Sequence, residues 1–121
     1  MKILFVRLKC RDLAASQRFY QQVFELSVEE ALTDAVLLRS ATGAYLKLEL
    51  SRYDPPASEW FLFGFDAETD EGLRAAHERA KACTEHTTQI FGGKLSRFMC
   101  IDPDGHHIEV HYDPEMSHRK R

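Results

Sequence analysis

Alternating apolar and polar residues predict a β-strand near the start of the chain. In residues 2–10, the even positions from Leu4 to Cys10 are apolar and form a core face, whereas the odd positions begin apolar and turn basic at Arg7 and Lys9. A period of two is typical of a strand that buries one face. The second face is therefore either half-exposed or part of a polar cavity.

The same period marks a strand near the other end of the chain. Residues 102–105, DPDG, have the composition of a tight turn, because proline fixes φ and glycine accepts the left-handed conformation. In the strand that follows, one face is apolar and the other places Glu109 between His107 and His111. Such a face is either the solvated outer side of an antiparallel sheet or part of a functional site.

Helical spacing and turn residues divide the rest of the chain. Asp12 is a candidate cap for a helix with an amphipathic stripe, and prolines mark a linker at 54–58. The stripe comprises Ser16, Phe19, Tyr20, Val23 and Phe24. A second helix is predicted over 69–84, with Leu73, Ala76, Ala80 and Cys83 on its buried side. Further strands are predicted near 26–31, 35–40, 44–51, 59–66, 87–91 and 95–101.

The two halves of the chain repeat one plan of strand, helix and three strands. Their last strands also agree in sequence, since LEL followed by YDP in the first half corresponds to IEV followed by YDP in the second. We predict an α+β fold in which paired βαβββ modules, about 1–54 and 58–113, form a single domain over 1–113. The strands would curl into a mixed-sheet cup with the helices outside, and 114–121 would be a flexible tail.

The strand faces that point away from the helices would line this cup. Carboxylates, histidines and several cations converge there, which is a composition typical of a site. The lining would comprise Phe5, Arg7, Lys9, Lys47, Glu49, Trp60, Leu62, His107, Glu109 and His111, with Arg97 or its neighbours joining from the seventh strand. The alternative is that the cations simply pair with the glutamates across the sheet.

Composition and charge argue against several classes of protein. The chain has 121 residues, 44% of them apolar and 29% charged, and a formal net charge of −3, which suits one soluble domain and argues against general nucleic-acid binding. Three cysteines without CxxC spacing indicate reduced thiols rather than a disulfide framework or a structural zinc site. No apolar run is long enough for a signal-peptide core or a membrane span, so we expect a cytoplasmic location.

Two motifs accompany the repeated plan. They are the helix start Asp12-Leu13-x-x-Ser16-x-x-Phe19-Tyr20 and the terminal Asp102-Pro103-Asp104-Gly105-His106-x-x-Glu109. Together with the plan they resemble the vicinal oxygen chelate superfamily, which includes glyoxalase I, bleomycin resistance proteins, fosfomycin resistance enzymes and extradiol dioxygenases. The resemblance covers about residues 1–113 and implies the fold, whereas the superfamily hosts many chemistries. It also implies a homodimer whose sites can be shared between subunits.

The resemblance implies four metal-ligand positions, which fall on Phe5, Glu49, Trp60 and Glu109. Both glutamates are present, but aromatic residues stand where histidines are common. A catalytic metal needs about three protein ligands, and two carboxylates alone make a weak, hydrated site. We therefore expect no metal cofactor; a divalent ion, if one binds, would be held by Glu49, Glu109 and His111.

A first functional hypothesis is a module that binds a small molecule without the superfamily's usual metal. Phe5 and Trp60 would stack on a planar or apolar part of the ligand. Arg7, Lys9 or Lys47 would meet its anionic groups, and His111 would complete the ligand-binding set.

A second hypothesis is a metal-dependent lyase, isomerase or dioxygenase with Glu49 and Glu109 as its catalytic residues. An intermediate hypothesis is a metal-free enzyme that uses either glutamate as general base. A third hypothesis is a structural or regulatory protein whose cup is vestigial. Because buried carboxylates cost free energy unless they are paired, the third hypothesis predicts that both glutamates are paired with arginine or lysine.

Overall fold

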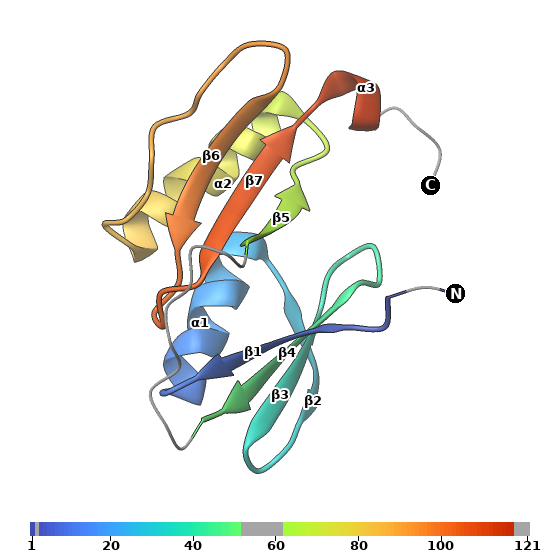
Figure 1. The fold of residues 1–121 in the computed structure, drawn as a ribbon, viewed down its shortest axis with the longest axis vertical. Coiled ribbons are helices and arrows are strands. Elements are labelled where there is room, and N and C mark those ends of the chain that lie inside the picture. Colours follow the sequence, from blue (N-terminus) through green and yellow to red (C-terminus); the bar gives the residue numbers. More distant parts are fainter. Residues whose placement is uncertain (2, 52–61, 118–121) are drawn as a thin grey trace. The chain divides into compact units, whose positions relative to one another are not determined.

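The computed structural model describes residues 1, 3–51 and 62–117 of the chain (Figure 1). The chain divides into two compact units, Met1–Ala57 and Ser58–Arg121, which are called the first and second unit and are described separately. Within the described residues, no helix is both long and apolar enough to cross a membrane. All three cysteines are free thiols, as predicted.

The first unit is a four-stranded sheet with one helix. Its elements are β1 (Val6–Cys10), α1 (Leu13–Phe24), β2 (Ser27–Ala31), β3 (Ala35–Arg39) and β4 (Tyr45–Leu50). The strand order is β1-β4-β3-β2, in which β1 runs parallel to β4 and the other pairs are antiparallel. The predicted βαβββ plan is therefore confirmed in this unit.

Helix α1 begins and ends where its sequence provides caps. The Asp12 side chain accepts a hydrogen bond from the Ala15 N–H at 3.0 Å, and Glu25 ends the helix in the left-handed conformation with φ 56°. Its buried residues Ser16, Phe19, Tyr20 and Val23 belong to the predicted stripe. They face β3 and β4, whose apolar residues complete the core of the unit.

The predicted core face of β1 is only partly correct. Leu8 and Cys10 are buried, but Leu4 is 66% exposed. Strand β1 starts at Val6, which pairs with Leu46 near the beginning of β4. Leu4 therefore lies beyond the end of the neighbouring strand and has no sheet partner to cover it.

The second unit contains a three-stranded sheet. Its elements are β5 (Leu62–Asp66), α2 (Asp70–Cys83), β6 (Ser96–Ile101), β7 (His107–Tyr112) and the short helix α3 (Pro114–Ser117). The strand order is β5-β7-β6, with β5 parallel to β7 and β6 antiparallel to β7. Helix α3 lies within the segment expected to be a tail, and the start of the predicted strand 59–66 falls outside the described residues.

The strand predicted near 87–91 is wrong. This segment runs beside β6 with two isolated bridges, Thr87 with Cys100 and Phe91 with Arg97, and the Thr88 N–H donates to the Met99 carbonyl at 2.9 Å. Between the two bridges, the Met99 N–H donates a hydrogen bond to the Thr88 hydroxyl at 3.0 Å. The register shifts by one residue between the two bridges, so the segment forms no continuous strand, and the described part of the second unit has two strands after its helix instead of three.

Helix α2 covers one face of this sheet (Figure 1). The Thr69 hydroxyl caps it by accepting from the Gly72 N–H at 2.9 Å. Leu73, Ala76 and Ala80 are buried as predicted, but Cys83 is exposed because the helix ends at this residue. On the covered face, Phe98, Cys100, Ile108 and Val110 are fully buried, whereas Phe63 and Phe65 of β5 are half-buried.

Leu48 and Leu50 test the role of the β4 core face in the first unit. We expect Leu48→Ala, at a fully buried position, to lower the free energy of unfolding by about 2–5 kcal/mol, because it leaves a cavity. Leu50→Ala, at a position 37% exposed, should cost less than about 1 kcal/mol. Urea unfolding followed by circular dichroism measures both, and equal costs would contradict the assigned core.

Candidate functional site

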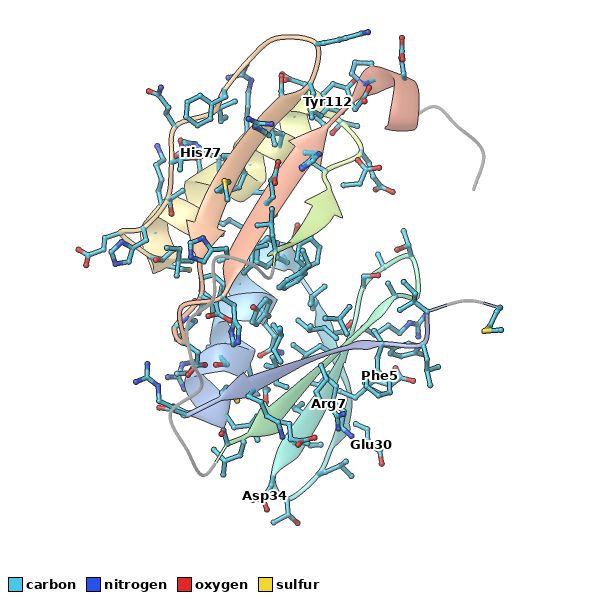
Figure 2. All side chains as sticks on the ribbon, in the orientation of Figure 1. Phe5, Arg7, Glu30, Asp34, His77 and Tyr112 are labelled. Carbon is cyan, nitrogen blue, oxygen red and sulfur yellow. The ribbon has the colours of Figure 1, made fainter. Side chains whose placement is uncertain are left out.

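The uncovered sheet face of the first unit gathers its basic residues. In the parallel register of β1 and β4, Arg7 pairs with Lys47 and Lys9 pairs with Glu49. Paired residues of neighbouring strands share one face, so these four side chains lie on the side opposite the buried leucines. Figure 2 labels Arg7 on β1 and Phe5 in the segment just before it.

Glu49 is held by cations of its own unit. The Lys9 ammonium makes a close ion pair with one carboxylate oxygen, and Arg7 Nη1 lies 3.4 Å from the other. The hydrogen bond from Lys9, with a smaller contribution from Arg7, lowers the pKa of Glu49 below its usual value, although partial burial opposes the shift. Glu49 therefore stays ionised, with its charge compensated inside the first unit.

Lys47 stands apart from this network. Its ammonium lies 5.7 Å from the centre of the Phe5 ring, in a cation–π contact. Among the residues that the structure describes, no carboxylate forms an ion pair with it. The cluster of Arg7, Lys9, Lys47 and Glu49 therefore carries three cations against one carboxylate.

The uncovered face of the second unit forms a grid of three rows across β5, β7 and β6. The register gives the rows Leu62–His107–Ile101, Gly64–Glu109–Met99 and Asp66–His111–Arg97. Glu109 occupies the centre and is flanked by glycine on β5. The predicted lining residues of this half thus lie together, with the exception of Trp60, which falls outside the described residues.

Glu109 also has basic partners in its own unit. Its Oε1 lies 2.7 Å from Nε2 of His111 and 3.9 Å from Nε of Arg97. The Glu109 side chain is only 14% exposed, whereas that of His111 is 38% exposed. A partly buried carboxylate therefore orients an accessible imidazole, which is an arrangement suited to binding or to proton transfer.

A second histidine–carboxylate pair lies in the turn between β6 and β7. Oδ1 of Asp102 accepts the N–H groups of Asp104 and His106, each at 2.9 Å, and Oδ2 lies 2.7 Å from Nδ1 of His106. This hydrogen bond raises the pKa of His106 above its usual value, although burial opposes the shift. Sequence reasoning missed the pair; its signal was the four-residue spacing of aspartate and histidine around Gly105, which adopts φ 91°.

Comparison with known proteins assigns the family. A model of the Glyoxalase/Bleomycin resistance protein/Dioxygenase superfamily matches residues 2–110. The chain belongs to this superfamily. No curated protein sequence matches the chain.

Solved structures of this superfamily agree with the fold. The fosfomycin resistance protein FosX of Listeria monocytogenes is 16% identical, with a TM-score of 0.81 and 98% of each chain covered. Lactoylglutathione lyase of Agrobacterium tumefaciens is 21% identical, with a TM-score of 0.75 and 98% of each chain covered. A possible glyoxalase of Bacillus cereus is 22% identical, with a TM-score of 0.72 over 91% of this chain and 97% of its own. Identities this low show a shared fold alone.

Members of this superfamily often use a divalent metal ion, and among the described residues neither glutamate cluster supplies the three donor atoms of a firm metal site. The groups nearest to Glu49 are cations, and these repel a metal ion. Glu109 and His111 place two donor atoms side by side, which is fewer than the three of a firm site, and Arg97 adds positive charge there. A third group, Asp102, Asp104 and His106, has donor atoms within 4.8 Å of one another. Both Asp102 oxygens already hold the turn together.

Two clusters thus emerge from the predicted site residues. The first unit brings Arg7 and Lys9 to Glu49, and the second brings Arg97 and His111 to Glu109. Phe5 and Glu49 do not meet in register, because Glu49 pairs with Lys9, four residues further along the chain. That the two clusters line one cup stays a prediction.

His106 provides a test by pH. The pKa of His106 is higher in the folded protein than in the unfolded chain, so protonated His106 stabilises the fold. This stabilisation is complete below the pKa of the unfolded chain and is lost as the pH rises through the pKa of the folded protein. The difference in free energy of unfolding between the parent and His106→Asn should therefore shrink as the pH rises above the usual histidine pKa of about 6.5 and through the raised pKa of His106. Denaturant unfolding at each pH measures it, with His86→Asn as the control at an exposed histidine. A difference that is constant or grows with pH would contradict the pair.

Proposed function

We propose that this superfamily member binds a small, planar anionic molecule on its uncovered sheet faces, without the superfamily's usual metal ion. Lys9 and Arg7 hold Glu49, and His111 and Arg97 hold Glu109. Both glutamates at the positions implied for metal ligands thus contact basic side chains of their own units, which disfavours a metal ion but is also what the hypothesis of a vestigial cup predicts. The observation that carries the binding proposal is that Lys47, beside the exposed Phe5 ring, has no carboxylate partner among the described residues.

Electrostatics in the first unit disfavour a divalent cation as ligand and favour an anion. A divalent cation at Glu49 would approach two fixed positive charges and would compete with both for the carboxylate oxygens. An anion would be attracted by these positive charges. It could bind Lys47 without breaking an ion pair, since Lys47 has no carboxylate partner among the described residues. The excess of positive charge therefore favours a carboxylate, sulfonate or phosphate-like group.

Aromatic residues favour a planar partner for this anionic group. Phe5 is 37% exposed beside Lys47, so one ring face is available for stacking. We assign the same role to Trp60, by its predicted place on the cup-lining face of the fifth strand. Arg7, Lys47 and His111 would supply the polar contacts.

The alternative is an enzyme, either a metal-dependent lyase, isomerase or dioxygenase that uses Glu49 and Glu109, or a metal-free one. The contact of 2.7 Å between Glu109 and His111 favours it, because these adjacent groups could exchange a proton with a substrate. Retention of a divalent ion by natively purified protein separates the metal-dependent form from the proposed binding module.

Assembly and location complete the proposal. Superfamily members bind small-molecule substrates and are often dimers. We propose that two copies of this chain pair as a homodimer in the cytoplasm, where free thiols are the usual state of cysteine. Neither nucleic acid nor a membrane is among the proposed partners.

Naphthalene-2-sulfonate, a planar aromatic anion, tests the proposal by ¹⁵N-NMR titration. We expect amide shifts in β1 and β4 and a dissociation constant that rises about three- to fivefold in Lys47→Met, the effect of one exposed charge pair. Lys81→Met, which removes a lysine paired with Glu78 on α2, is the matched control and should leave the constant unchanged. An unchanged constant in Lys47→Met, or shifts confined to other elements, would count against the anion site.

Trp60 offers a second readout, because it is the single tryptophan of the chain. Its indole N–H gives one cross-peak, which should move during the titration with the same dissociation constant as the strand amides. Trp60→Ala should weaken binding about tenfold, since an aromatic stacking contact is lost. A stationary indole signal, together with unaltered binding by Trp60→Ala, would remove Trp60 from the site.

A further inference from the structure

Gly64 stands at the centre of β5, and nothing in its own unit requires a glycine. It is exposed, and its φ lies outside the left-handed region. A Cβ at this position would lie 3.4 Å from the main-chain oxygen of Glu109 and 3.9 Å from Nε2 of His111, which are ordinary contact distances. Any residue that favours strands could therefore occupy the position.

Two other glycines of the chain, Gly72 and Gly105, have a structural reason. Gly105 adopts the left-handed conformation in its turn, and a Cβ on Gly72 would lie 2.5 Å from the main-chain oxygen of Ala67. In a strand, glycine is unfavourable, because it loses more conformational freedom on folding and packs no side chain against its neighbours. A strand glycine that packing does not require often marks a place where a ligand or another backbone approaches closely.

The missing side chain leaves bare main chain at Gly64 on the uncovered face of the second unit, beside His111, and we call this position the notch. Leu62 and Asp66 are the next residues of β5 on this face, about 13 Å apart by strand geometry, and only main chain lies between them. Beside the notch lies the contact between Glu109 and His111. Because a Cβ on Gly64 would touch the Nε2 atom that meets Glu109, a larger side chain would cover this pair.

We propose that Gly64 determines the specificity of the binding site by admitting a flat group of the ligand, an aromatic ring or a conjugated carbonyl, onto its bare main chain. Leu62 provides an apolar edge for this group, and His111 and Arg97 meet its polar atoms. The proposal rests on the proposed function and adds to it the part of the ligand that the second unit recognises.

Two substitutions of graded size test the proposal on the full chain. Gly64→Ala adds one methyl group, and Gly64→Val adds a branched side chain suited to a strand. Gly92→Ala is the matched control, because a Cβ at Gly92 has no atom within 4 Å and its φ is also outside the left-handed region. Each variant is measured for its melting temperature, its oligomeric state and its dissociation constant for naphthalene-2-sulfonate by ¹⁵N-NMR.

We expect both Gly64 variants to melt at or above the temperature of the parent, because glycine is the weaker strand former. The dissociation constant should rise in the order of side-chain size, by about tenfold or more in Gly64→Val, since the side chain fills the ligand's space. Gly92→Ala should bind like the parent.

The contrary outcomes are distinct from one another. If the parent itself does not bind the probe, the proposed function fails and the role of Gly64 fails with it. If the parent binds and Gly64→Val binds equally well, only the role of Gly64 is overturned. A lower melting temperature in Gly64→Ala would show that the fold needs this glycine. A changed oligomeric state in Gly64→Val would assign the notch to contact between chains. Either result would also overturn the proposal.

Discussion

The burial of alternate residues on β4 and β7 is the constraint on which both units depend. Each strand is paired on both sides, and each turns one set of residues toward a helix. Leu48 on β4 and Ile108 on β7 are fully buried. Because side chains alternate along a strand, a shift of one residue would bury Glu49 or Glu109 in place of its neighbour. The core therefore fixes the register, and the register fixes which charged groups meet on the uncovered faces.

Charge compensation within each unit follows from that register. Lys9 lies opposite Glu49 on the neighbouring strand, and Arg97 lies one row from Glu109. In a superfamily whose members often use a metal ion, these cations supply the positive charge that the glutamates need. We propose that the same fold here binds an anionic small molecule in place of coordinating an ion, since function depends on the site rather than on the fold.

Local sequence patterns predicted most of the fold, and non-local geometry accounts for what they missed. The stripe of α1 and the alternation of β4 follow from spacing alone. The family follows from a resemblance in the repeated plan and two motifs, and the match over residues 2–110 confirms it. The exposure of Leu4 depends on where β4 begins, and the failed strand near 87–91 depends on the change of register between its two bridges to β6. The cations at the glutamates could be named from the sequence, but which cation meets which glutamate required the pairing of strands.

Elemental analysis of natively purified protein, prepared without chelator or nickel affinity resin, tests the central claim most directly. The parent is compared with Glu109→Gln, which removes a carboxylate charge and keeps the side-chain shape. If Glu49 and Glu109 are compensated by the chain's own cations, both proteins should contain almost no divalent metal. Near-stoichiometric metal in the parent that disappears in Glu109→Gln would contradict the account and would favour the metal-dependent enzyme.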